Sequence, residues 1–123
     1  MGLEGRMRND RDNLIVRLTL EFAVDIIRYT EILEEKRKFV IARQLLKSGT
    51  SIDANIREAQ NAESKVDFIH KMKIAAKEAD ETENWLLLCM ESKNYPFNEE
   101  LLEKIKSISF ILSKIIGTSK RTK

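Results

Sequence analysis

The sequence predicts an all-α protein, an up-down-up-down antiparallel four-helix bundle. The chain has 123 residues, the size of one domain. It contains four glycines and one proline, too few for the frequent turns of a β-rich fold. Long segments instead place apolar residues at steps of three and four, which is the spacing of one helical face. Short connections between four such segments make sequential helices antiparallel.

The first helix is expected to begin at Asp12, with Asp12 or Asn13 as its cap, and to end before the charged connection at residues 34–38. Residues 1–11 lack apolar periodicity, which predicts a disordered arm ahead of a bundle domain at residues 12–117. The predicted core face of this helix comprises Ile15, Leu18, Phe22, Ile26, Tyr29 and Leu33.

The second helix is expected from Phe39 to about Ala62, and Gly49 lies in its middle. A loop at residues 48–51 is the alternative, because glycine costs about 1 kcal/mol inside a helix and Ser51 is a good cap. The apolar stripe keeps its phase across Gly49, which favours one continuous helix with Gly49 on the packed face. That stripe comprises Ala42, Leu45, Gly49, Ile52, Ile56 and Ala59.

The third helix opens with a capping box. Ser64 is expected to accept from the backbone amide of Asp67, and the Asp67 carboxylate to reach back to the amide of Ser64. Pro96 ends this helix region, because proline lacks an amide proton and disfavours helix at the residue before it. The core face comprises Phe68, Met72, Ala75, Ala79, Thr82, Leu86 and Cys89.

The fourth helix is expected to start after Asn98, its cap, with Glu99 and Glu100 in the first turn. Gly117 is a typical C-terminal stop, and residues 118–123 are then a basic tail. The core face comprises Leu101, Ile105, Ile108, Leu112 and Ile115.

Residues that carry chemistry are scarce. The single histidine, His70, follows Asp67 at the spacing of di-iron bundles, but that architecture needs the pair twice, so Asp67 is interpreted as a cap. Cys89 lies about 28 Å further along the same helix, too far for a Cys–His pair. We therefore expect no enzyme activity, no catalytic residue, no metal site and no cofactor.

The longest apolar run, Trp85–Met90, is far shorter than the ~20 residues that cross a bilayer. The N-terminus lacks the apolar region of a secretory signal. These features predict a cytoplasmic protein without membrane association, in which Cys89 is a reduced, buried apolar residue.

Polar side chains border the predicted core of the second and third helices. A structural network that fixes helix register or subunit packing is the favoured interpretation, and an acidic ligand site is the alternative. The candidate network comprises Ser51, Asn55, Glu58, Glu78 and Glu81.

Basic side chains form a second stripe. Within a net charge of only +2, residues 36–77 carry ten Lys/Arg against four Asp/Glu. Within one chain, ion pairs between neighbouring helices are the favoured interpretation of this excess. Phosphate binding is the alternative, and a ring would strengthen it by repeating the stripe. The candidate nucleic-acid-binding residues are Arg43, Lys47, Arg57, Lys73 and Lys77.

Apolar residues also occur outside the core faces, more than one bundle interior needs. Surplus apolar surface is typical of an interface, which predicts a homo-oligomer. The residues concerned are Val16, Leu20 and Ile27 in the first helix and Ile74, Trp85 and Leu88 in the third.

Two segments carry a family resemblance: FVIARQLLKSGTSIDANIREAQ at residues 39–60 and SKVDFIHKMKIAAKEADETENWL at residues 64–86. Over residues 12–116 the chain resembles the small bacterial four-helix bundle proteins linked to intervening sequences in 23S ribosomal RNA genes. Its most specific part is Ser51-x-x-Ala-Asn-Ile-x-Glu58. Asp53 stands where many members carry proline, and aspartate is easier to place inside a continuous helix.

The resemblance implies a homopentameric ring and no catalytic residue. Relatives of this family include the accessory protein of diversity-generating retroelements, a basic, barrel-shaped binder of nucleic acid and of a reverse transcriptase. The candidate partners that the resemblance implies are therefore further copies of the chain, RNA or DNA, and a protein such as a reverse transcriptase. We expect a non-enzymatic, ring-forming interaction module that binds RNA or DNA through its basic surface; the alternative is an adaptor that binds only proteins.

Overall fold

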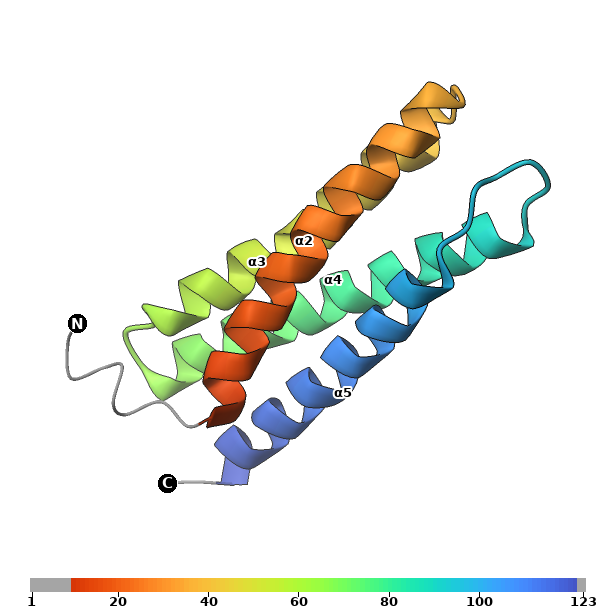
Figure 1. The fold of residues 1–123 in the computed structure, drawn as a ribbon. Coiled ribbons are helices and arrows are strands. Elements are labelled where there is room, and N and C mark those ends of the chain that lie inside the picture. Colours follow the sequence, from red (N-terminus) through yellow and green to blue (C-terminus); the bar gives the residue numbers. More distant parts are fainter. Residues whose placement is uncertain (1–9, 122–123) are drawn as a thin grey trace.

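The computed structural model describes residues 10–121, and within them the chain forms four helices (Figure 1). Their bounds are α2, Asp10–Glu35; α3, Phe39–Gln60; α4, Lys65–Glu91; and α5, Glu99–Arg121. Each helix packs against the next, and α5 also packs against α2, so that α2 begins and α5 ends at the same end of the bundle. The predicted all-α, up-down-up-down antiparallel four-helix bundle is confirmed.

The core is built from the faces that the apolar spacing predicts. All the predicted core residues are buried except Leu18 and Phe68, which are half-buried. Cys89 is among the buried residues, and burial raises the pKa of its thiol above the usual value. The stripe of each helix therefore faces the interior along its full length.

The second helix is continuous through Gly49, which confirms the first interpretation and excludes the loop. A Cβ atom built on Gly49 would lie 2.9 Å from Cγ2 of Ile26, closer than van der Waals contact allows. The missing side chain thus lets the α3 backbone approach α2. Glycine is required at this position by contact rather than by backbone conformation, because no described glycine has a positive φ.

The end of the bundle that carries the two connections is fastened by local bonds. After α2, the amide of Lys38 donates to the carbonyl of Leu33 (2.8 Å), and Arg37 takes a left-handed conformation with φ 64°. This is the geometry of a Schellman motif, in which glycine is usual at the position of Arg37. Across the bundle, the Tyr29 hydroxyl donates to the carbonyl of Pro96 (2.6 Å) and ties the α4–α5 connection to α2.

Two expected helix ends are wrong. The first helix starts at Asp10 rather than at a cap on Asp12 or Asn13, so the arm predicted at residues 1–11 includes two helical residues, and the remainder lies outside the described part of the chain. At the other terminus, α5 continues through Gly117 to Arg121, so residues 118–121 are helical rather than tail. Gly117 lacks the left-handed conformation that a glycine stop requires, and the backbone hydrogen bonding of the helix continues past it.

The second helix ends at Gln60, slightly before the expected Ala62. The cap of α4 forms with one difference. Ser64 accepts from the amide of Asp67 at 3.0 Å, as expected, but the Asp67 carboxylate accepts from the amide of Glu63 (3.2 Å) rather than from that of Ser64. Asn98 caps α5 by accepting from the amide of Leu101 at 3.2 Å.

Candidate functional site

The polar contact that crosses between α3 and α4 in the interior is one that sequence reasoning missed. The Thr82 hydroxyl lies 2.9 Å from Oγ of Ser48 and 2.8 Å from the carbonyl of Glu78, and both side chains are buried. Thr82 lies within the predicted core stripe. A polar side chain at a core position needs a hydrogen-bond partner, and this is the signal from which the contact could have been predicted. Each hydroxyl also has a carbonyl partner in its own helix, and the bond between the two hydroxyls joins α3 to α4 in the interior.

The predicted polar network lies along the outer side of the α3–α4 seam. The hydrogen bonds of Ser51 and Asn55 go to their own helix: Ser51 Oγ donates to the carbonyl of Lys47 (2.7 Å), and Asn55 Nδ2 donates to that of Ser51 (2.9 Å). The bond that crosses the seam joins Lys71 Nζ to Glu58 Oε1 at 2.7 Å. This hydrogen bond raises the pKa of Lys71, and the negative charge of Glu58 adds to the rise.

The two carboxylates of α4 have different surroundings. Glu81 Oε2 accepts from the indole of Trp85 at 3.2 Å. Partial burial raises the pKa of Glu78, the charge of Glu81 adds to this effect, and the ammonium groups of Lys47 and Lys77 oppose it. Ser51, Asn55 and Glu78 thus border one seam, although no hydrogen bond recorded among the described residues joins the first two to the third.

The five candidate basic residues do not form one cluster. Arg43, Lys47 and Arg57 lie on the outer side of α3 and are exposed, and Arg57 Nε pairs with Asp53 at 3.3 Å. The ion pairs found within residues 14–121 involve neither Arg43 nor Lys47. Lys77 lies beside Glu78, whereas Lys73 lies beside Lys120 of α5. Lys47 of α3 and Lys77 of α4 thus both act on Glu78, whereas Lys73 lies beside α5.

Charge is also uneven along the bundle. One half of the bundle holds the first turns of α2 and the last turns of α5. It carries nine Lys/Arg and five Asp/Glu and comprises residues 14–24, 51–77 and 110–121. The opposite half (residues 25–50 and 78–109) carries nine Lys/Arg and twelve Asp/Glu. A nearly neutral chain thus presents a basic end and an acidic end.

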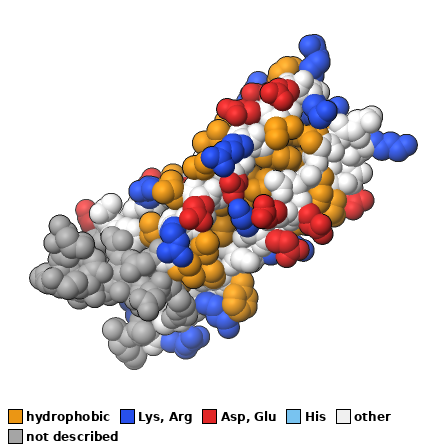
Figure 2. Space-filling model, in the orientation of Figure 1, with side chains coloured by type: hydrophobic (Ala, Val, Ile, Leu, Met, Phe, Trp, Pro, Cys, Tyr) orange, Lys and Arg blue, Asp and Glu red, His pale blue; other side chains and the backbone are white. Residues whose placement is uncertain are grey.

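Apolar side chains reach the surface at several places, and two of these places include residues of the predicted interface. On α2, Leu20, Val24 and Ile27 share one helical face and are 43%, 38% and 42% exposed. On α4, Leu88 is 45% exposed and Trp85 is half-buried. Figure 2 shows apolar patches between charged side chains on one face of the molecule. Of the other predicted interface residues, Val16 and Ile74 are half-buried.

The described residues contain no group of three or more His, Cys, Asp and Glu side chains placed to hold a metal ion. Within residues 10–121, no helix combines the length and the apolar character that crossing a bilayer requires.

Comparisons with known proteins agree with the fold. Residues 11–116 match the family model described as 23S rRNA-intervening sequence protein. A crystal structure of a protein with unknown function, from the S23 ribosomal protein family of Bacteroides thetaiotaomicron VPI-5482, is similar at a TM-score of 0.81 and 43% identity, covering 87% of this chain and 98% of the other. No curated protein matches the chain. The chain belongs to the 23S rRNA-intervening sequence protein family.

Proposed function

We propose that the protein is a non-enzymatic interaction module that assembles into a homopentameric ring and presents this ring to a macromolecular partner. The similar crystal structure is of a protein with unknown function, so the proposal depends on the surface of this chain. The subunit number follows from the family resemblance. The assembly follows from the observation below.

The observation that carries the proposal is the pair of apolar faces on different sides of the bundle. Ile27 lies on the flank of α2 opposite Asp25, which bonds to Lys104 of α5 (2.7 Å), so the α2 face points away from α5. The second face, around Leu88, belongs to α4. Two different faces suit a head-to-tail contact, which closes into a ring, whereas a two-fold dimer needs one self-complementary face.

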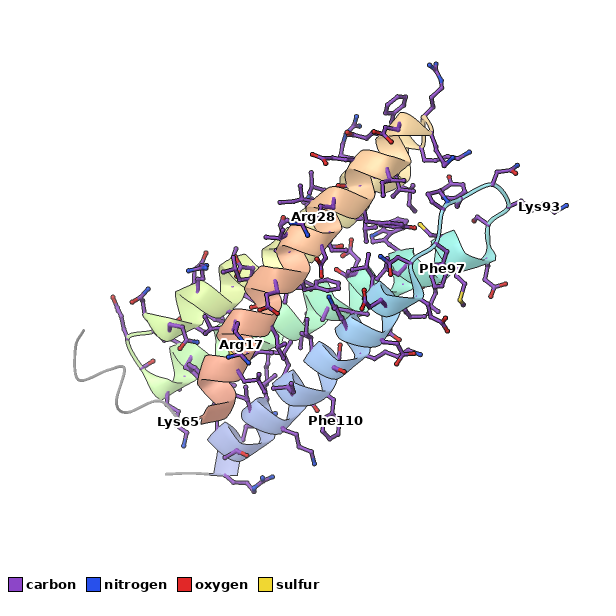
Figure 3. The ribbon with its side chains drawn as sticks, viewed as in Figure 1. Arg17, Arg28, Lys65, Lys93, Phe97 and Phe110 are labelled. Carbon is purple, nitrogen blue, oxygen red and sulfur yellow. The ribbon has the colours of Figure 1, made fainter. Side chains whose placement is uncertain are left out.

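The test uses one charge on each face. Ile27→Glu and Leu88→Glu should each convert the ring to monomer, measured by native mass spectrometry and light scattering. Mixing the two variants should give a one-to-one dimer, because each retains the face that the other has lost. Phe110→Glu is the control: Phe110 projects from α5, is 62% exposed and lies on neither face (Figure 3). A monomeric unmodified protein, or a mixture that stays monomeric, contradicts the head-to-tail ring.

RNA or DNA is the partner that the charge distribution favours. Arg43 and Lys47 are exposed and lie outside the recorded ion pairs, and a ring would repeat them and the basic ends by symmetry. Binding to structured RNA and duplex DNA should weaken linearly in a log–log plot against salt. Substituting Arg43, Lys47 and Arg57 by alanine should reduce the slope. Absence of binding at ~50 mM salt would leave the protein-binding adaptor, for a partner such as a reverse transcriptase, as the proposed role.

A further inference from the structure

A shallow pocket lies between the first turns of α4 and the last turns of α5, at the basic end of the bundle. Its volume is about 350 Å³, and it is lined by Val66, Ile69, His70 and Lys73 of α4 and by Lys120 of α5. Pockets of 300–1,000 Å³ are the usual size for small ligands. No carboxylate is among these described lining residues, although the chain as a whole carries 20 Asp and Glu.

The two lysines form an unbalanced pair of positive charges. Lys120 lowers the pKa of Lys73, first because a neutral Lys73 amine can accept a hydrogen bond from the Lys120 ammonium and second because the two positive charges repel. Elsewhere in the described chain, Arg28, Arg57, Lys71 and Lys104 each pair with a carboxylate. The only carboxylate in the first turn of α4, that of Asp67, accepts from the amide of Glu63 instead. Two adjacent lysines with no carboxylate among the described residues that line the pocket are suited to an anion that both can contact.

The rest of the pocket is apolar or aromatic. Val66 is 78% exposed, Ile69 is half-buried, and the His70 imidazole is exposed beside them. Histidine is one of the side chains on which unstacked bases lie in protein–RNA complexes, and apolar side chains can contact a base or a sugar without selecting its sequence. An anion-binding surface and a surface that can contact a base therefore lie next to each other.

We propose that this pocket binds one nucleotide unit of a single-stranded nucleic acid, with its phosphate between Lys73 and Lys120 and its base against Val66, Ile69 and His70. The inference rests on the proposed nucleic-acid binding and specifies a place for it. The pocket is separate from Arg43, Lys47 and Arg57, because these three residues lie on the outer side of α3. Lys77 lies one turn beyond Lys73 on α4, and in this proposal it contacts the next phosphate of the bound strand.

The test compares binding of a short single-stranded oligonucleotide, adenosine monophosphate and inorganic phosphate, each followed by amide chemical shifts and by a salt series. Lys73→Gln with Lys120→Gln should weaken oligonucleotide affinity at least about tenfold at low salt and reduce the salt slope by about one for each lysine removed. Lys106→Gln, which removes an exposed lysine of α5 outside the pocket, is the matched control and should leave the pocket resonances unchanged.

A second variant separates the base contact from the phosphate contact. Val66→Ser should weaken the oligonucleotide and adenosine monophosphate severalfold and leave inorganic phosphate unaffected. Equal binding of phosphate and nucleotide would overturn the base contact and identify a free-phosphate site instead. Unchanged oligonucleotide affinity in the lysine double variant overturns the pocket and leaves binding through Arg43, Lys47 and Arg57 standing. No binding of the oligonucleotide by the unmodified protein overturns the pocket, whereas binding of structured RNA or duplex DNA by the same protein would still support Arg43, Lys47 and Arg57.

Discussion

Close approach of neighbouring helices has opposite effects in two regions of the molecule. One region is the interior around Ser48 and Gly49 of α3, and the other is the surface between α4 and α5 at Lys73 and Lys120. In the interior, the Gly49 backbone packs against Ile26 and the Ser48 hydroxyl is hydrogen bonded, so that proximity stabilises the fold. At the surface between α4 and α5, two ammonium groups approach and repel each other. The difference teaches that contacts inside the bundle serve stability, whereas a surface position can hold an unfavourable arrangement when stability is supplied elsewhere.

The largest effect is expected from filling the interior at Gly49. Gly49→Leu forces a side chain into Ile26 and should destabilise the protein by about 1–3 kcal/mol through overpacking, measured by urea unfolding. Gly117→Leu is the control, since a Cβ at Gly117 meets only the flexible Arg121 guanidinium, at 3.6 Å. Equal losses at both positions would contradict the close approach to Ile26 as the cause, since helix propensity alone favours leucine over glycine.

The hydroxyl pair between α3 and α4 is expected to contribute less to stability. Thr82→Val removes the bond to Ser48 while keeping nearly the same shape, and should cost about 1 kcal/mol because the Ser48 hydroxyl loses a buried partner. Adding Ser48→Ala should cost less than the sum of the two single changes, since each of them breaks the same bond between Ser48 and Thr82. Additive losses in a double-mutant cycle would contradict the pairing.

Substitution of Gly117, which lies outside the close contact of α2 and α3, is expected to give a smaller change in stability, and this change is a gain. Gly117→Ala should stabilise the protein by about 0.5 kcal/mol, because glycine inside a helix costs unfolding free energy relative to alanine and the position has room for a Cβ. Thermal unfolding measures the gain. A loss would show that Gly117 needs its conformational freedom after all.

Comparison of these positions explains how far the sequence could predict the structure. The helices and their core faces follow from residue spacing alone, and so does the burial of Gly49, because the stripe keeps its phase across it. The helix end at Gly117 was wrong, since a glycine stops a helix only where surrounding contacts favour a positive φ. Local sequence does not contain that information.

The candidate site could be predicted only in part for a related reason. Exposure of Arg43 and Lys47 follows from their place opposite the core face. The pairs Ser48–Thr82 and Lys73–Lys120 join residues of different helices, so they depend on register and on helix length. Lys120 in particular was assigned to a tail, and it reaches Lys73 because α5 extends to Arg121.

The smallest expected effect concerns the charge of Glu78 at the outer α3–α4 seam. Partial burial and the neighbouring Glu81 raise its pKa, despite the opposing Lys47 and Lys77, so the charged form is disfavoured in the folded protein. The folded state then binds more protons than the unfolded state between the ordinary and the raised pKa, and stability falls as pH rises through this window. Glu78→Gln should therefore raise Tm at pH 7 by less than about 4 °C. The gain should disappear below the ordinary pKa of 4.5, where the carboxyl is neutral in both states. A gain that persists in acid, or a loss at pH 7, would show that the lysines outweigh burial and that Glu78 belongs with the paired, stabilising contacts of the seam.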